Sequence, residues 1–172
     1  MRKGGTGGAS TKSGTKFEAI KDLALYLESF KGYKVKDDDV LFNGNTVARI
    51  CSKYDLYKFA NEEFGVDWKD KISTRLVPDQ AIYVFGNRTL YIVECKTQSG
   101  AGSVDEKLQT CDYKIKQYRK LFKGTGVKVE YAYLLSEWYE RDQYKDVKEY
   151  IESVGCTYYF KFIPLSRLGL PT

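Results

Sequence analysis

The segment Val77–Lys96 constrains the fold more than any other part of the chain. It holds two runs rich in Ile, Val, Tyr and Phe, separated by a Gly-Asn dipeptide at 86–87. A dipeptide of this kind between β-prone runs is a strong signal for a two-residue hairpin turn. We therefore expect an antiparallel strand pair here.

The register of this hairpin predicts a cluster of charged side chains. If Phe85 and Arg88 flank the turn, counting outward along both strands places Asp79 opposite Glu94. Opposed side chains in an antiparallel pair lie about 4.5–5.5 Å apart, and Lys96, two residues further on, shares the face of Glu94. Two carboxylates and a lysine are therefore expected to converge.

The remaining sequence predicts one α/β domain over residues 15–172, preceded by a flexible basic arm at 1–14. The arm is rich in Gly, hydroxyl and basic residues and has almost nothing apolar to bury. Apolar spacing and turn residues predict a mixed central sheet flanked by helices. The expected helices are 15–31, 54–64, 103–122 with a buried face of Leu108, Cys111, Ile115, Tyr118 and Leu121, and 143–154, and the other expected strands are 33–36, 46–51, 128–135 and 157–163.

Composition excludes several classes of function. The 172 residues include no histidine, so mechanisms that need an imidazole are ruled out. Four cysteines are scattered singly, without the spacing of a zinc site, and are expected to be reduced and mostly buried. A net charge of +5 favours a polyanionic partner. No apolar run is long enough to span a membrane and no signal peptide is recognisable, so a cytoplasmic protein is expected.

The carboxylate pair itself indicates a divalent cation. Opposed carboxylates repel each other unless something neutralises them. Mg²⁺ prefers oxygen ligands and typically takes one or two carboxylates together with water and substrate phosphate, which Asp79 and Glu94 could supply. Lys96 could stabilise charge developing on the phosphate or orient the attacking water.

These residues also carry a resemblance to a known family. Val77-Pro78-Asp79 followed by Val93-Glu94-Cys95-Lys96 resembles the split signature of the PD-(D/E)XK nuclease superfamily. That family has a core of helix, three-stranded meander, helix and strand (αβββαβ), and Glu18 on the expected N-terminal helix resembles the acidic residue that many members place there. The stretch from Glu94 to Leu108 is similar to small type II restriction endonucleases. The resemblance extends over roughly residues 15–163.

The resemblance implies a restriction endonuclease-like enzyme that hydrolyses double-stranded DNA with Mg²⁺, or with Mn²⁺ in its place. It implies Asp79 and Glu94 as metal ligands, Lys96 as the catalytic lysine and Glu18 as an accessory acid. One active site per chain further implies a homodimer, or pairing with a second catalytic subunit, if both strands are cut. The cytoplasm of a prokaryote or a phage-infected cell is the expected setting.

Several residues are candidates for DNA contact, each with a simpler interpretation. Gln98 could bind a phosphate or a metal-bound water, or be a solvated strand end. Arg75 is the one residue nominated in the loops before the hairpin. Lys107 begins a basic set on the 103–122 helix, which either follows phosphates or is a solvated helix face; its other members are Lys114, Lys116, Arg119, Lys120 and Lys123.

Three other interpretations remain open at this point. Lys96 could form a purely structural salt bridge with Asp79 or Glu94, and Glu18 could be a solvated residue near a helix N-terminus. A Holliday junction resolvase would share the chemistry but not the substrate. A non-catalytic DNA-binding module would bind DNA without Mg²⁺ and would not cut it.

Overall fold

The computed structural model of the protein describes residues 22–98 and 104–172, with side chains described from residue 106 onward in the second range. A seven-stranded mixed sheet forms its centre, in the order β1-β2-β3-β4-β5-β6-β7. Neighbouring strands from β1 to β5 are antiparallel, whereas β5, β6 and β7 are parallel. The strands are β1 (Tyr33–Lys36), β2 (Asp39–Phe42), β3 (Asn45–Ile50), β4 (Gln80–Val84), β5 (Thr89–Lys96), β6 (Lys128–Leu135) and β7 (Thr157–Phe160).

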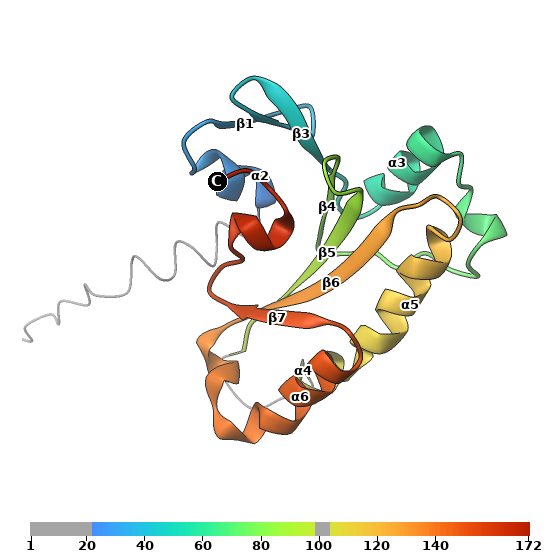
Figure 1. The fold of residues 1–172 in the computed structure, drawn as a ribbon. Coiled ribbons are helices and arrows are strands. Elements are labelled where there is room, and N and C mark those ends of the chain that lie inside the picture. The colour runs from blue at the N-terminus through green and yellow to red at the C-terminus, as the bar shows by residue number, and fades with distance from the viewer. Residues whose placement is uncertain (1–21, 99–103) are drawn as a thin grey trace, which may run out of the picture.

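Helices cover both faces of this sheet, so the α/β class expected from the sequence is confirmed (Figure 1). One face carries α2 (Leu23–Glu28) and the 3₁₀ turn η5 (Leu165–Leu168). The other face carries α3, α5 and α6. The buried side chains of these helices pack with side chains of the strands in one apolar cluster. The helices on this second face are α3 (Asp55–Phe64), α4 (Val104–Lys107), α5 (Cys111–Leu121) and α6 (Lys145–Ser153), with 3₁₀ turns η1 (Trp68–Asp70), η2 (Leu108–Thr110), η3 (Glu137–Glu140) and η4 (Asp142–Tyr144) between them in sequence.

The predicted register of the β4–β5 hairpin is confirmed. Gln80 pairs with Val93 and Val84 with Thr89, which is the register that sets Asp79 opposite Glu94. The turn itself differs from the expected two-residue type. The positive φ that a tight hairpin needs falls on Arg88 (φ 54°) and not on the Gly-Asn dipeptide, and the Arg88 amide donates to the carbonyl of Phe85 at 3.3 Å.

The predicted helices are also present, with two local differences. Gly65 ends α3 in the left-handed conformation at φ 64°, as its position in the sequence indicated. The helix expected over 103–122 is interrupted by η2 at Leu108–Thr110, so α5 starts only at Cys111. All five residues expected on its buried face are buried. The helix predicted over 15–31 is shorter within the described residues: α2 begins at Leu23, after the extended N-cap Asp22, and ends at Glu28. Residues 15–21 and the predicted basic arm at 1–14 lie outside the described residues.

The strands between residues 33 and 51 form a three-stranded meander where the sequence predicted a pair. The turn at Asn43-Gly44 joins β3 to β2, a short strand that was not predicted, and β2 pairs in turn with β1. The last strand, β7, ends at Phe160 and not at Ile163, because Lys161 adopts a positive φ of 66°.

The cysteines and the hydrophobicity of the helices agree with the sequence-based expectations. All four cysteines are free; Cys51, Cys111 and Cys156 are buried and Cys95 is half-buried. Within the described ranges, no helix has the length and apolar character needed to cross a membrane.

Candidate functional site

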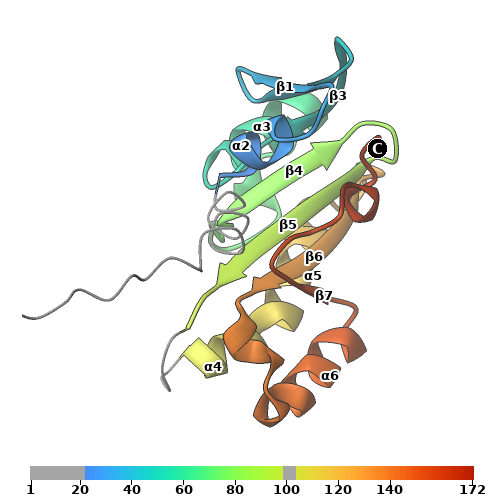
Figure 2. The ribbon, with the colours of Figure 1, turned by 90° about the vertical axis from the view of Figure 1, so that its left-hand side faces the viewer.

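The predicted acidic pair and lysine meet beside the carboxyl end of β5. Glu94 and Lys96 lie on β5 itself, and Asp79 immediately precedes β4. This end of β5 lies beside the carboxyl end of the parallel strand β6, with which it pairs as far as Lys96 (Figure 2). Side chains alternate along a strand, so all three residues share the sheet face that α5 covers, together with the buried Ala81 and Ile92.

Lys96 joins the two carboxylates directly. Its Nζ lies 2.9 Å from Glu94 Oε2 and 3.6 Å from Asp79 Oδ2. The backbone amide of Cys95 donates a hydrogen bond of 3.0 Å to the same Asp79 oxygen, which fixes this carboxylate across the hairpin. The two acids therefore share one ammonium group, as the hairpin register predicted.

A second lysine completes the site, and sequence analysis did not assign it there. Lys114 on α5 places its Nζ 3.3 Å from Glu94 Oε1, so each oxygen of Glu94 has its own cation. The sequence pattern places Lys114 only in the basic set of this helix. One signal was available: Lys114 directly precedes Ile115 of the buried stripe, so its side chain starts at the edge of the helix face that packs on the sheet.

Burial makes this cluster different from an ordinary surface ion pair. Only 4% of the Glu94 side chain is exposed, compared with 47% for Asp79. A buried carboxylate is stable in its charged form only when it is paired and hydrogen-bonded. Burial alone would lower the pKa of Lys96, but the attraction of Glu94 and Asp79 outweighs it and raises this pKa above 10.5. Lys96 is thus held in its charged form near neutral pH.

A buried tyrosine on α5 lies close to the acids. Tyr118 is 1% exposed, and its hydroxyl has no hydrogen-bond partner within the part of the chain that the structure describes. Burial raises the pKa of Tyr118, and the nearby Tyr57, Glu94 and Asp79 raise it further. The site is thus bordered by a neutral hydroxyl group.

The other predicted site residues lie at varied places around this cluster. The Gln98 side-chain oxygen accepts a hydrogen bond of 3.0 Å from the Tyr139 hydroxyl. The Arg75 guanidinium packs against three aromatic rings, with 4.7 Å to the Tyr54 ring centroid. Lys107 is exposed, and its carbonyl accepts a hydrogen bond from Tyr133. Glu18 lies outside the described residues. Roles in DNA contact for Gln98, Arg75 and Lys107 stay predictions.

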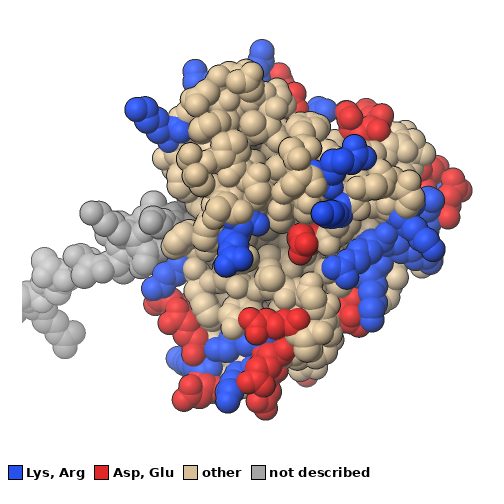
Figure 3. Space-filling view, in the orientation of Figure 1, with Lys and Arg blue, Asp and Glu red and all other residues tan. Residues whose placement is uncertain are grey.

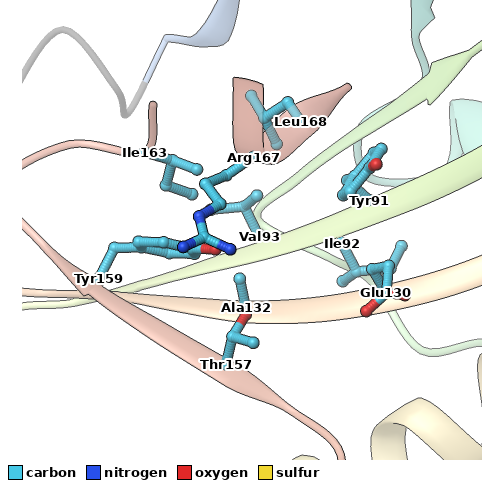
Figure 4. Close-up of a pocket in the computed structure, with 10 residues that line it drawn as sticks. All are labelled: Tyr91, Ile92, Val93, Glu130, Ala132, Thr157, Tyr159, Ile163, Arg167 and Leu168. Carbon is cyan, nitrogen blue, oxygen red and sulfur yellow. The ribbon is translucent and has the colours of Figure 1, made fainter. Parts of the chain in front are cut away.

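A separate hollow lies on the opposite face of the sheet and does not belong to this cluster. Tyr91, Val93 and Ala132 form part of its floor, and the Arg167 side chain from η5 extends over it beside Tyr159 (Figure 4). Tyr91 and Val93 alternate with Glu94 and Lys96 along β5, so the sheet separates the hollow from the acids.

The arrangement provides two oxygen donors and two ammonium groups at one end of the sheet. Within residues 22–98 and 104–172, no group of three or more His, Cys, Asp or Glu side chains is placed to hold a metal ion. Two carboxylates nevertheless suffice for Mg²⁺ where water and a phosphate supply the other ligands. Comparison with models of protein families, with curated proteins and with solved structures found no match.

Proposed function

We propose that the protein is a Mg²⁺-dependent endonuclease that hydrolyses phosphodiester bonds of double-stranded DNA, with a restriction endonuclease-like mode of action. The observation that carries the proposal is the meeting of Asp79 and Glu94 on the ammonium group of Lys96. Opposed acids can hold a metal ion that assists phosphodiester hydrolysis, and an adjacent ammonium group can stabilise the charge that develops on the phosphate. The chain has no histidine that could serve another hydrolytic mechanism.

Each residue has a defined role in this proposal. Asp79 and Glu94 would hold the cation, which when bound polarises the scissile phosphate and activates water. Lys96, already held in its charged form, stabilises the negative charge that develops on the phosphate. Lys114 holds the second oxygen of Glu94 and so fixes the orientation of this carboxylate. Mn²⁺ would substitute for Mg²⁺ because it accepts the same oxygen ligands.

The order of elements supports a restriction endonuclease-like core. Helix α2 precedes the antiparallel strands β3, β4 and β5, and α5 then leads to β6, which is parallel to β5. This is the helix, meander, helix, strand order expected from the resemblance. Three features depart from it: α3 is inserted between β3 and β4, β1 and β2 extend the sheet beyond β3, and α6 leads to β7, which extends the sheet beyond β6.

The proposal also carries expectations about assembly and setting. The part of the chain that the structure describes contains one such acid pair, so cutting both strands would require two chains, either two copies or this chain with a second catalytic subunit. Light scattering of the purified protein with and without duplex DNA would measure this stoichiometry. The enzyme would act in the cytoplasm of a prokaryotic or phage-infected cell.

The decisive experiment is cleavage of a long unmethylated DNA in Mg²⁺, read on a gel. We expect discrete bands with wild-type protein and loss of cleavage in Asp79→Asn, Glu94→Gln and Lys96→Met. Matched controls are Lys58→Met and Glu62→Gln, which remove an exposed ion pair on α3. Both controls should cut like wild type, and circular dichroism should show that every variant is folded.

The other outcomes separate the rival functions. A smear in place of bands, together with preferred cutting of four-way junctions, would indicate a structure-selective nuclease such as a junction resolvase. Intact DNA with binding that does not need Mg²⁺ would indicate a non-catalytic binding module, and the acid cluster would then be a structural ion network.

A further inference from the structure

A group of cations without carboxylate partners lies on the described surface away from the acid cluster. Five exposed basic residues gather around the turn between α5 and β6 and the turn between β4 and β5. We call this set the basic patch; its members are Arg88, Arg119, Lys120, Lys123 and Lys128. In the space-filling view, Lys and Arg side chains gather on the right-hand side of the molecule, where α5 ends (Figure 3).

Hydrogen bonds to backbone carbonyl groups hold the segments of the basic patch together. The Lys128 amide donates to the Arg88 carbonyl at 2.9 Å, and the Arg88 guanidinium donates to the Thr125 carbonyl at 3.0 Å. Arg119 donates to the carbonyl of Val129 at 3.5 Å. Three separate stretches of chain therefore bring their cations to one place, and the arrangement is fixed by the fold.

The surface between these cations is hollowed. Arg119, Lys123 and Lys128 line one depression, and Gly124 and Gly126 form part of its wall. Both glycines have positive φ and carry no side chain, so the turn leaves the depression open. One acid, Glu130, lies at its rim, and the cations outnumber it.

The charges of the basic patch are not balanced by ion pairs. Across the described ranges, none of its five cations lies within 4.0 Å of a carboxylate, whereas Lys96, Lys114 and Lys116 all do. The dipole of α5 favours Arg119 and Lys120, which lie in its last turn. It does not explain Arg88 and Lys128, which lie at the ends of strands.

The basic patch is distinct from the candidate active site. Arg88 and Lys128 lie at the amino ends of β5 and β6, whereas Glu94 and Lys96 lie near the carboxyl end of β5. Eight residues of strand separate Arg88 from Lys96, which corresponds to about 26 Å. The Arg88 end of the basic patch is therefore remote from the acid cluster.

We propose that the basic patch binds the phosphate backbone of DNA without reading its sequence, as a second contact surface of the protein. The inference rests on the proposed function for the choice of DNA as the polyanion. The chemistry of the basic patch suits a contact with the DNA backbone. Flexible lysines and arginines around an open depression attract phosphates, and their binding releases the counterions condensed on the DNA. Such a contact strengthens binding to any duplex.

The test uses the full chain and a 20-base-pair duplex of arbitrary sequence, with EDTA present so that binding is measured without cleavage. In the triple variant Lys120→Ala, Lys123→Ala and Lys128→Ala, we expect affinity to fall about tenfold or more. The slope of log affinity against log salt concentration should become shallower by about 2 to 3, since each phosphate contact contributes about 0.9. The matched control is Lys58→Ala, Lys145→Ala and Lys161→Ala, which removes the same charge from lysines that are paired with carboxylates. The control should keep the wild-type slope.

Thermal unfolding supplies a second readout that a structural role would move. Removing like charges that repel one another should leave the midpoint of the patch variant at or above that of the wild type. A lowered midpoint with unchanged DNA affinity would overturn the proposal, because the lysines would then serve the fold. Binding of phosphatidylserine vesicles through these lysines, with no binding of the duplex, would overturn it in favour of a membrane contact.

The outcomes for the two proposals can be told apart. Loss of affinity in the patch variant, with a wild type that binds but never cuts DNA, would support the basic patch and refute the nuclease. A wild type that cuts DNA and a patch variant that binds it as tightly, with the same slope, would refute the basic patch alone.

Discussion

Glu94 is the most constrained charged residue among those described. Its side chain is almost fully buried, and Lys96 and Lys114 each hold one of its oxygens. Losing either cation leaves a buried carboxylate with a single partner, whereas Asp79 is half exposed and is solvated on its open side. The stability of this corner of the sheet therefore depends on the charged state of the lysines.

The raised pKa of Lys96 predicts how this contribution varies with pH. The folded protein binds the Lys96 proton more tightly than the unfolded chain does, so the contribution is complete below pH 10.5 and is lost as the pH rises through the higher folded pKa. We expect Lys96→Met to lower the free energy of unfolding by about 1.5–3 kcal/mol at pH 8, a typical value for hydrogen bonds to charged groups. Urea titrations at increasing pH should show the gap to wild type closing above pH 10.5.

The control for this prediction is Lys58→Met. Lys58 pairs with Glu62 at 3.9 Å on an exposed helix face, so its loss should cost less than about 1 kcal/mol. A gap for Lys96→Met that stayed constant from pH 8 to pH 12 would contradict the assignment of the raised pKa to the ion pairs.

Removing the hydroxyl oxygen from either of two buried tyrosines should change the free energy of unfolding in opposite directions. Tyr118 has no hydrogen-bond partner within the described chain, whereas the Tyr133 hydroxyl donates to the Lys107 carbonyl at 3.0 Å. Tyr118→Phe should raise the free energy of unfolding by about 1 kcal/mol, because an unsatisfied buried group disappears. Tyr133→Phe should lower it by about 1 kcal/mol. Urea unfolding of both variants measures the difference, and a loss of stability in Tyr118→Phe would show that its hydroxyl is satisfied in solution.

At the scale of elements, the end of α3 provides a clean test of backbone conformation. Gly65 has φ 64° and open space where a Cβ would lie. A side chain at this position would therefore be unfavourable only because of the left-handed backbone conformation. Gly65→Ala should cost about 1–2 kcal/mol. Gly86 has equally open surroundings without a positive φ, so Gly86→Ala should change stability by less than about 0.5 kcal/mol. If Gly65→Ala and Gly86→Ala lowered the stability equally in thermal unfolding, the result would argue against a left-handed conformation of Gly65 at the end of α3.

Local signals in the sequence were sufficient for the elements that carry the acid pair. The register of β4 and β5 follows from counting outward from the turn, and the alternation of apolar residues fixes which face each side chain shares. The positions of Asp79, Glu94 and Lys96 were predictable for this reason. The type of the turn was not predictable, because Arg88 takes the positive φ, although asparagine and glycine stand one and two residues earlier.

Contacts between distant elements could not be predicted in the same way. The pairing of Lys114 with Glu94 depends on how α5 crosses the sheet, which no local pattern encodes. The short strand β2 was missed because its four residues include Asp39, which is unfavourable in strands. Its formation depends on pairing with β1 and β3 on either side.

At the scale of the whole molecule, the sheet separates two apolar cores, which are covered by different elements. The core beneath α3, α5 and α6 adjoins the acid cluster. The other core is closed by α2 and by the last residues of the chain, since the hydroxyls of Tyr26 and Tyr33 donate to the carbonyls of Ile163 and Pro171, each at 2.6 Å. Helix α2 and strand β1 are thus joined to the C-terminal residues over one face, and the acid cluster lies on the other.

This separation predicts that damage to the second core will act independently of the acid cluster. Leu168 on η5 is 2% exposed within that core, so Leu168→Ala should lower the free energy of unfolding by about 2–5 kcal/mol. Ser166→Ala, an exposed change on the same turn, should alter it by less than about 0.5 kcal/mol. In the double variant Leu168→Ala with Lys96→Met, the two losses should add to within about 0.5 kcal/mol, as expected for distant sites without shared partners. A larger departure from additivity in urea unfolding would mean that the sheet transmits strain between its faces, and that the C-terminal turn helps to set the geometry of Glu94.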